Sequence, residues 1–174
     1  MSLPSAKILV AVAEGTAWIR ICGRANFLTS VEFKTLVNEL FAAGHRKFTL
    51  DLGECALMDS TFLGVLAGFG MRFRKTAGAG EITFELCNAN ERVTGLLTNL
   101  GVAHLFTLVS GTVVAPDAGV ERPAGEKPDA ETTARTCLEA HETLMAIEPK
   151  NIPKFKDVAQ FFAEDLKNFK TKPD

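Results

Sequence analysis

Acidic and hydroxyl side chains gather in the segment 50–66, LDLGECALMDSTFLGVL, where a strand-like apolar run meets a helix-like one. Asp51 lies in the first run, and Asp59, Ser60 and Thr61 stand together immediately before the second. Two carboxylates can act as general acid and base, and a serine can serve as a nucleophile or a phosphoacceptor. A serine at a helix start can instead cap the helix, which stabilises it by about 1 kcal/mol. The segment is therefore compatible with a catalytic site, a phosphorylation switch or a helix cap.

The catalytic interpretation needs a base or a cofactor, and the sequence offers neither in a recognisable pattern. The histidines His45, His104 and His141 show no catalytic or metal-ligand spacing. His141 falls on the apolar stripe of a C-terminal helix, which favours a packing role. The glycines at 78–80 precede a strand, whereas a dinucleotide-binding turn follows one. We therefore predict no catalytic residue, no metal and no cofactor, and we expect that the protein is not an enzyme.

The composition is typical of an ordinary soluble domain. The 174 residues are 47% hydrophobic and have a formal net charge of −2, which supplies no basic surface for nucleic acid or an anionic membrane. The apolar run 7–13 ends at Glu14 and is too short for a signal sequence or a membrane span. Four widely spaced cysteines in apolar surroundings favour buried thiols: Cys22, Cys55, Cys87 and Cys137. The sequence predicts a cytoplasmic protein with no membrane insertion and no direct nucleic-acid contact.

Hydrophobic periodicity predicts alternating strands and helices over most of the chain. Strands are expected at 7–13, 17–23, 47–52, 81–88 and 105–109, and helices at 28–44, 60–78 and 89–101. Because helices connect most strands, the sheet should be mainly parallel, while the first two strands form an antiparallel hairpin. Thr29 or Ser30 is expected to cap the first helix. The predicted class is α/β, a sandwich of a mixed four- to five-stranded sheet with helices.

The chain changes character after this region. We expect a domain over 1–112, a flexible linker rich in proline and charge over 113–129, and a helical C-terminal extension over 130–174. Two amphipathic helices are predicted in the extension, at 130–148 and 152–170. Their apolar faces must be covered by the chain's own domain, by a second copy in a homodimer, or by a partner.

Three glycines, Gly64, Gly68 and Gly70, lie in the helix expected at 60–78. Each costs about 1 kcal/mol relative to alanine in a helix interior, so their presence suggests close packing on that helix. We expect the close neighbour to be the sheet.

The order of the elements and the residues at the junction resemble the STAS domain of bacterial anti-sigma factor antagonists. That family carries Asp-Ser-[Ser/Thr]-Gly-Leu-Gly after a strand that ends in aspartate, and this chain has DSTFLG at 59–64. The resemblance covers about residues 7–110 and includes the Gly-Arg pair at 23–24, Asn88 and the run 101–106. It implies a STAS-like sandwich, here with a C-terminal two-helix extension.

In that family, the serine that matches Ser60 is phosphorylated by a partner that is both an anti-sigma factor and an ATP-dependent serine kinase. The resemblance implies that the unphosphorylated protein binds this partner, that phosphorylation releases it, and that a phosphatase resets the switch. Asp59 would support the phosphoacceptor, and Asp51 would lie near the partner-facing loop. The implied partner-binding residues are Asp51, Asp59, Ser60, Thr61, Phe62, Leu63 and Gly64.

Phe62 stands where the family commonly has glycine. Its ring either packs beneath the helix or obstructs the approach of a kinase. The second outcome favours an alternative function, a non-phosphorylated STAS scaffold or a cytoplasmic subunit of a lipid transport system. A third class, a small enzyme that uses Asp51, Asp59 and Ser60, requires a base that the sequence does not identify.

Overall fold

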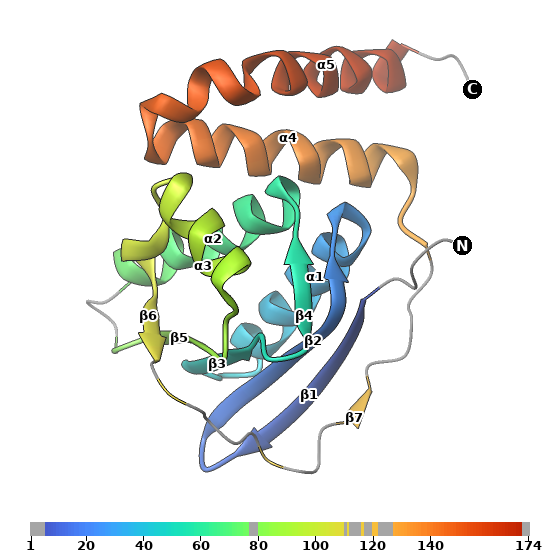
Figure 1. The fold of residues 1–174 in the computed structure, drawn as a ribbon. Coiled ribbons are helices and arrows are strands. Elements are labelled where there is room, and N and C mark those ends of the chain that lie inside the picture. Colours follow the sequence, from blue (N-terminus) through green and yellow to red (C-terminus); the bar gives the residue numbers. More distant parts are fainter. Residues whose placement is uncertain are drawn as a thin grey trace.

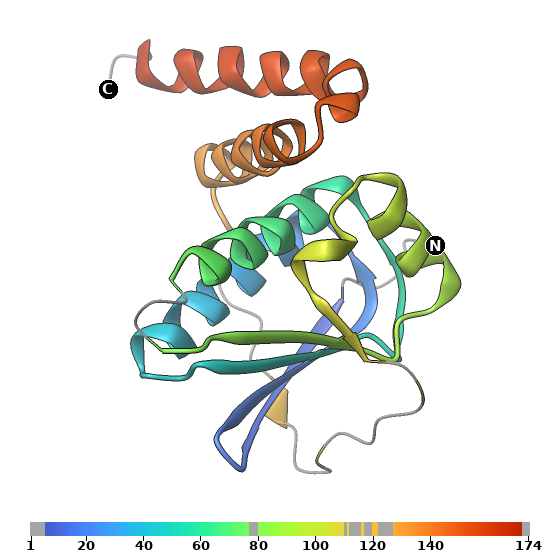
Figure 2. The ribbon, with the colours of Figure 1, turned by 90° about the vertical axis from the view of Figure 1, so that its left-hand side faces the viewer.

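The computed structural model describes most of the chain, namely residues 6–76, 80–109, 111, 116, 120–121 and 127–171. The molecule is layered: helices cover one face of a twisted sheet, and two C-terminal helices stack outside them (Figure 1). The view turned by 90° shows the same succession of sheet, inner helices and outer helices (Figure 2). The predicted α/β class and the two-helix extension are therefore confirmed.

Seven strands form the sheet within the described residues. They are β1 (Lys7–Ala13), β2 (Thr16–Ala25), β3 (Lys47–Asp51), β4 (Cys55–Met58), β5 (Thr83–Cys87), β6 (Thr107–Val109) and β7 (Val120–Glu121). Their hydrogen-bonded order is β6-β5-β3-β2-β1-β7, and β4 pairs with β2 off this path. β1 is antiparallel to β2 and β7, whereas β2, β3, β5 and β6 pair in parallel.

Two of these strands exceed the four or five that the sequence predicts. β4 is only four residues long, too short for a clear alternation, and it pairs with β2 across a register shift between Gly23 and Arg24. β7 falls in the predicted linker 113–129 and pairs with β1. Most of that linker lies outside the described residues, so the three predicted segment boundaries stay predictions.

Five α-helices complete the described fold: α1 (Phe27–Ala42), α2 (Ser60–Lys75), α3 (Glu91–Asn99), α4 (Ala130–Ile147) and α5 (Ile152–Thr171). Short 3-10 turns lie at Ala103–Leu105 and Pro149–Asn151. α4 packs on α2 and α1, and α5 packs mainly on α4. The chain's own domain therefore covers the apolar face of α4. This is one of the three alternatives that the sequence left open.

The layer between the sheet and the inner helices is rich in phenylalanine. Phe33 of α1 packs on Phe62 and Phe69 of α2, with ring centroids 4.9 and 6.0 Å away. Towards the other end of α2, Phe73 stacks on Phe48 of β3 at 5.3 Å. These rings recur on one side of α2 at helical spacing and bury it against the sheet. The packing fixes the position of the first turn of α2, at the end of β4.

Asn26 caps α1. Its side-chain oxygen accepts the backbone N–H groups of Leu28 and Thr29, each at 3.1 Å. The prediction that Thr29 or Ser30 is the cap is wrong, because the helix already begins at Phe27 and both residues are buried in its first turn.

Candidate functional site: the start of helix α2

Asp59 caps helix α2. It remains extended, with φ −90° and ψ 172°, and its carboxylate accepts the backbone N–H of Phe62 at 2.8 Å. One of the unpaired donors of the first turn is thereby satisfied. Ser60 is the first helical residue, and the helix does not use its hydroxyl as a cap. The helix-cap interpretation of Ser60 is therefore wrong.

The hydroxyl of Ser60 bonds instead to a histidine 81 residues further along the chain. Ser60 Oγ lies 2.9 Å from His141 Nε2, and His141 Nδ1 lies 2.7 Å from the carbonyl oxygen of Cys137. Because a carbonyl only accepts, Nδ1 carries a proton and donates it. In the neutral imidazole, Nε2 then accepts the hydroxyl proton of Ser60. This hydrogen bond joins the start of α2 to the middle of α4.

The His141 ring is enclosed between helices and is only 3% exposed. Phe155 and Phe162 of α5 lie against it, with ring centroids at 5.1 and 6.4 Å. The apolar stripe of the sequence correctly indicated this packing role. It could not reveal the second partner, Ser60, because the two residues come from separate helices.

Asp59 is half-buried, and this desolvation raises the pKa of its carboxyl above the usual range. The backbone N–H of Phe62, which donates to this carboxylate, acts in the opposite direction on that pKa. A phosphoryl group on Ser60 would place further negative charge beside a carboxylate that is already poorly solvated.

Asp51 is held at the end of β3 by three groups. Its Oδ2 accepts Arg20 Nε at 3.0 Å, and its Oδ1 accepts the Gly53 N–H and Asn88 Nδ2, also at 3.0 Å. The hydrogen bond to Asp51 raises the pKa of Arg20. Both oxygens of Asp51 are thus engaged by groups other than Asp59. The buried Asp51 braces the turn that leads into β4.

The cysteines are unpaired thiols: Cys22 is half-buried, and Cys55, Cys87 and Cys137 are buried. Desolvation and a hydrogen bond to Glu54 raise the pKa of Cys22 to about 12, so this thiol stays protonated at neutral pH. Across the described ranges, no group of three or more His, Cys, Asp or Glu side chains could hold a metal ion.

The four residues implied for partner binding after Ser60 are buried: Thr61, Phe62, Leu63 and Gly64. Phe62 packs beneath α2 on Phe33, so its ring does not obstruct the approach to Ser60. Of the seven residues in the implied set, Asp59 and Ser60 keep partial exposure.

Gly64 allows α4 to approach α2 closely. A Cβ added there would meet the carbonyl oxygen of Ala140 and lie 2.7 Å from the Ala140 Cβ. The expectation that the sheet is the close neighbour is therefore wrong for Gly64, whose neighbour is a helix. A Cβ at Gly70 would lie 2.9 Å from the Phe106 ring, whereas one at Gly68 would meet nothing within 4 Å.

Comparison with models of known protein families assigns the domain to a family. The family model of the STAS domain matches residues 7–115. The chain belongs to the STAS domain family. A search of curated proteins finds no match to the chain. The STAS match ends before α4, so both C-terminal helices lie outside it.

Three solved structures are similar to this chain, and the first of them shows the same fold. A candidate anti-sigma factor antagonist from Thermotoga maritima is 20% identical, with a TM-score of 0.51 over 59% of this chain and 85% of that one. The anti-sigma factor antagonist SpoIIAA, unphosphorylated, is 16% identical with a TM-score of 0.46, over 64% and 90% of the two chains. The phosphorylated Bacillus SpoIIAA is 18% identical with a TM-score of 0.45, over 63% and 92%.

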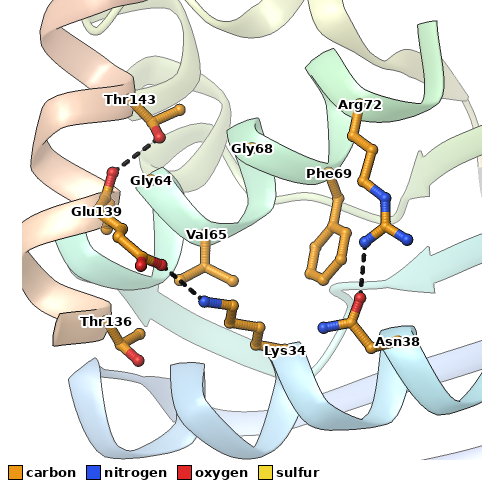
Figure 3. Close-up of a pocket in the computed structure, with 11 residues that line it drawn as sticks. Lys34, Asn38, Gly64, Val65, Gly68, Phe69, Arg72, Thr136, Glu139 and Thr143 are labelled. Atoms are coloured by element: carbon orange, nitrogen blue, oxygen red, sulfur yellow. Dashed lines mark hydrogen bonds and ion pairs between the residues drawn. The ribbon is translucent and has the colours of Figure 1, made fainter. Parts of the chain in front are cut away.

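A pocket of about 190 Å³ lies between the STAS domain and α4 (Figure 3). Lys34 of α1 and Glu139 of α4, both on its wall, form an ion pair of 2.9 Å. Its lining residues do not include Ser60 or His141.

The Ser60–His141 pair has the form of a hydroxyl beside a base, which is also found in nucleophilic catalysis. Turnover would further require space for a substrate next to the hydroxyl and donors for the developing charge. The pocket beside α4 does not reach the pair, so it provides no such space. Within the described part of this STAS protein, none of the helices combines the length and apolar character needed to cross a membrane. The geometry shows a Ser60 hydroxyl that is bonded to His141 of α4.

Proposed function

We propose that this chain is an anti-sigma factor antagonist, a regulatory protein whose binding to an anti-sigma factor/serine kinase is switched by phosphorylation of Ser60. The observation that carries the proposal is the placement of Ser60 directly after the Asp59 cap, with a hydroxyl that the helix does not need. Membership of the STAS family and the fold shared with a candidate antagonist support it. In this proposal the protein acts in the cytoplasm, and a phosphatase restores Ser60.

Phosphorylation at this position can change binding without unfolding the domain. A phosphate adds about −1.5 to −2 charges at neutral pH. The first turn of α2 tolerates part of that charge, because helix N-termini favour anions, and the cap on Asp59 is left in place. A partner surface that fits a neutral Ser60 would meet repulsion and a desolvation cost instead.

The partner-binding surface proposed here centres on Asp59 and Ser60. Asp51 shapes it by bracing the turn after β3. Phe62 and Leu63 anchor the first turn of α2 in the core, while Thr61 and Gly64 lie beneath α4. A homodimer through the C-terminal helices stays a prediction.

A pull-down from the source organism's lysate tests the proposal. The baits are wild type, Ser60→Glu, Ser60→Ala and Thr98→Glu, where Thr98 is exposed on α3 and controls for added charge elsewhere. We expect a serine kinase to be recovered by wild type and Thr98→Glu and lost by Ser60→Glu. Ser60→Ala should retain it, because the site stays neutral. Equal recovery by Ser60→Glu and Thr98→Glu would contradict the switch.

One observation favours the alternative, a non-phosphorylated STAS scaffold or a cytoplasmic subunit of a lipid transport system. The Ser60 hydroxyl is already bonded to His141 beneath α4, which restricts access to it. In that case all four baits should co-purify with the same membrane ATPase components.

A further inference from the structure

We propose that the outer face of α2 is a helix-binding surface, and that α4 is a displaceable intramolecular cover of this face with which the kinase partner competes for Ser60. The competition rests on the proposed function, whereas the cover itself can be tested without a kinase. The outer face of α2 is defined here by Ser60, Thr61, Gly64 and Gly68, which follow one side of the helix.

The first anchor of the cover is the contact at Gly64. Only a hydrogen atom separates its Cα from the backbone of Ala140, so α4 lies directly on α2. Thr61 Oγ1 also reaches Cys137 Sγ at 3.8 Å, and Cys137 is one turn before His141. Small residues on both helices make this close approach possible.

The second anchor is the hydrogen bond between Ser60 and His141. Phe155 and Phe162 of α5 pack against the imidazole, so the ring cannot retreat while α4 and α5 stay together. A phosphoryl group on Ser60 Oγ would occupy the space in which His141 Nε2 now lies, 2.9 Å away. A phosphorylated Ser60 and a docked α4 therefore exclude one another.

Several features of the contact favour separation over permanent packing. Beyond Gly64 the two helices diverge: Gly68 has open space where a Cβ would be, and the pocket of Figure 3 opens beside it. The ion pair of Lys34 with Glu139 is exposed on both sides, so water can replace it. The outer face of α2 itself is small and polar, which limits the cost of exposing it to water.

The far end of the cover is held more firmly. Asn151, which is fully buried, donates its two amide protons to the carbonyl oxygens of Leu100 and Leu144, each at 2.9 Å. Leu144 is also buried in the core of the STAS domain. We infer that the turn between α4 and α5 stays attached, while the part of α4 from His141 back towards its N-terminus separates from α2 and uncovers Ser60.

The native cysteines report on this opening. Cys137 lies in the contact between α4 and α2, whereas Cys87 lies in β5, inside the sheet. Both are buried, at 3% and 1% exposure. Labelling by N-ethylmaleimide, followed for each cysteine by mass spectrometry, separates opening of α4 from unfolding of the domain.

The decisive variants are Gly64→Ala and its matched control Gly68→Ala. Both add one methyl group to α2, but only the first collides with α4. We expect labelling of Cys137 to accelerate at least tenfold in Gly64→Ala and to stay unchanged in Gly68→Ala, with Cys87 slow in both. His141→Ala should also accelerate Cys137 labelling, because it removes the hydrogen bond without a collision. Equal rates for Cys137 in all variants would overturn the cover, as would equal acceleration of Cys87.

The functional arm uses radiolabelled ATP and lysate from the source organism. If the kinase competes with α4, Gly64→Ala should incorporate phosphate at Ser60 faster than Gly68→Ala. Equal incorporation by the two variants would overturn the competition. If none is incorporated at Ser60 by any variant, the proposed switch fails, while Cys137 labelling still decides whether α4 is a displaceable cover.

Discussion

The two sides of helix α2 differ in the size of their side chains and in the apolar area that they bury. The side towards the sheet carries large apolar residues, Phe62, Leu66, Phe69 and Phe73, all buried. The side towards α4 carries Ser60, Gly64 and Gly68 at four-residue spacing. The first side gains stability from burial of area, at about 25 cal/mol per Å². The second allows a close neighbour because its residues are small, and it buries less apolar area of its own than the first.

The largest expected effect lies on the sheet side. Phe73→Ala removes a ring that stacks on Phe48 and Phe84, and should lower the free energy of unfolding by about 3–5 kcal/mol in urea titrations. Phe161→Ala, on α5, is the control, since this ring is 60% exposed and its loss should change the value by less than about 0.5 kcal/mol. Similar losses in both variants would remove the contrast between inner and outer layers.

An intermediate effect is expected where the cover is attached. Asn151→Ala removes the side-chain donor to the buried carbonyl oxygen of Leu100 and one of the two donors to that of Leu144, which keeps the Glu148 N–H; this should cost roughly 1–3 kcal/mol in thermal or urea unfolding. Asn168→Ala, at an exposed position of α5, controls for the loss of an amide and should be neutral. If Asn151→Ala is equally neutral, the turn between α4 and α5 is not the firm end of the cover.

A smaller, pH-dependent effect is expected at Asp59. Because burial raises the pKa of this carboxyl in the folded protein, the folded state binds its proton more readily than the unfolded chain. Stability contributed by Asp59 is therefore lost as pH rises from the ordinary carboxyl pKa, about 4, through the raised value. Asp59→Asn keeps a capping oxygen and stays neutral.

The stability of Asp59→Asn relative to wild type should thus increase over that pH window and be constant well above it. Thermal unfolding between about pH 3 and 8 measures the difference. If the wild type instead becomes more stable relative to Asp59→Asn as pH rises, the negative charge of Asp59 stabilises the folded state.

The smallest effect is expected for the ion pair between α1 and α4. Lys34 and Glu139 are both substantially exposed, so a double-mutant cycle with alanine should give a coupling of about 0.2–1 kcal/mol that salt weakens. The exposed pair Glu131–Arg135 within α4 serves as a control that does not bridge to α1. A larger coupling for Lys34–Glu139 would mean that this contact holds the cover in place.

Hydrophobic periodicity was enough to predict the side of α2 that faces the sheet. The buried rings of α2 repeat at helical spacing, and the alternating strands around them follow the same local rules. The prediction of an α/β fold and the two C-terminal helices was accordingly confirmed. β4 was missed because four residues are too few for a pattern, and its pairing with β2 depends on distant residues.

The outer side of α2 could not be predicted in the same way. Ser60 and His141 are 81 residues apart, and no local signal links them. The sequence placed a hydroxyl at the helix start but assigned it the capping role that Asp59 performs. Gly64 indicated close packing, yet the identity of the neighbour depended on where α4 docks. Local rules described each helix, and only the tertiary arrangement revealed their contact.

The short strand β7 has a consequence for association between molecules. It pairs with Leu9 and Val10 of β1 and so occupies hydrogen-bonding groups along the border of the sheet. Borders with free backbone groups recruit strands from other chains and promote aggregation. β7 lies beyond the STAS match, which ends at residue 115. A chain shortened to the family domain alone would free this border of β1 and should be more prone to self-association.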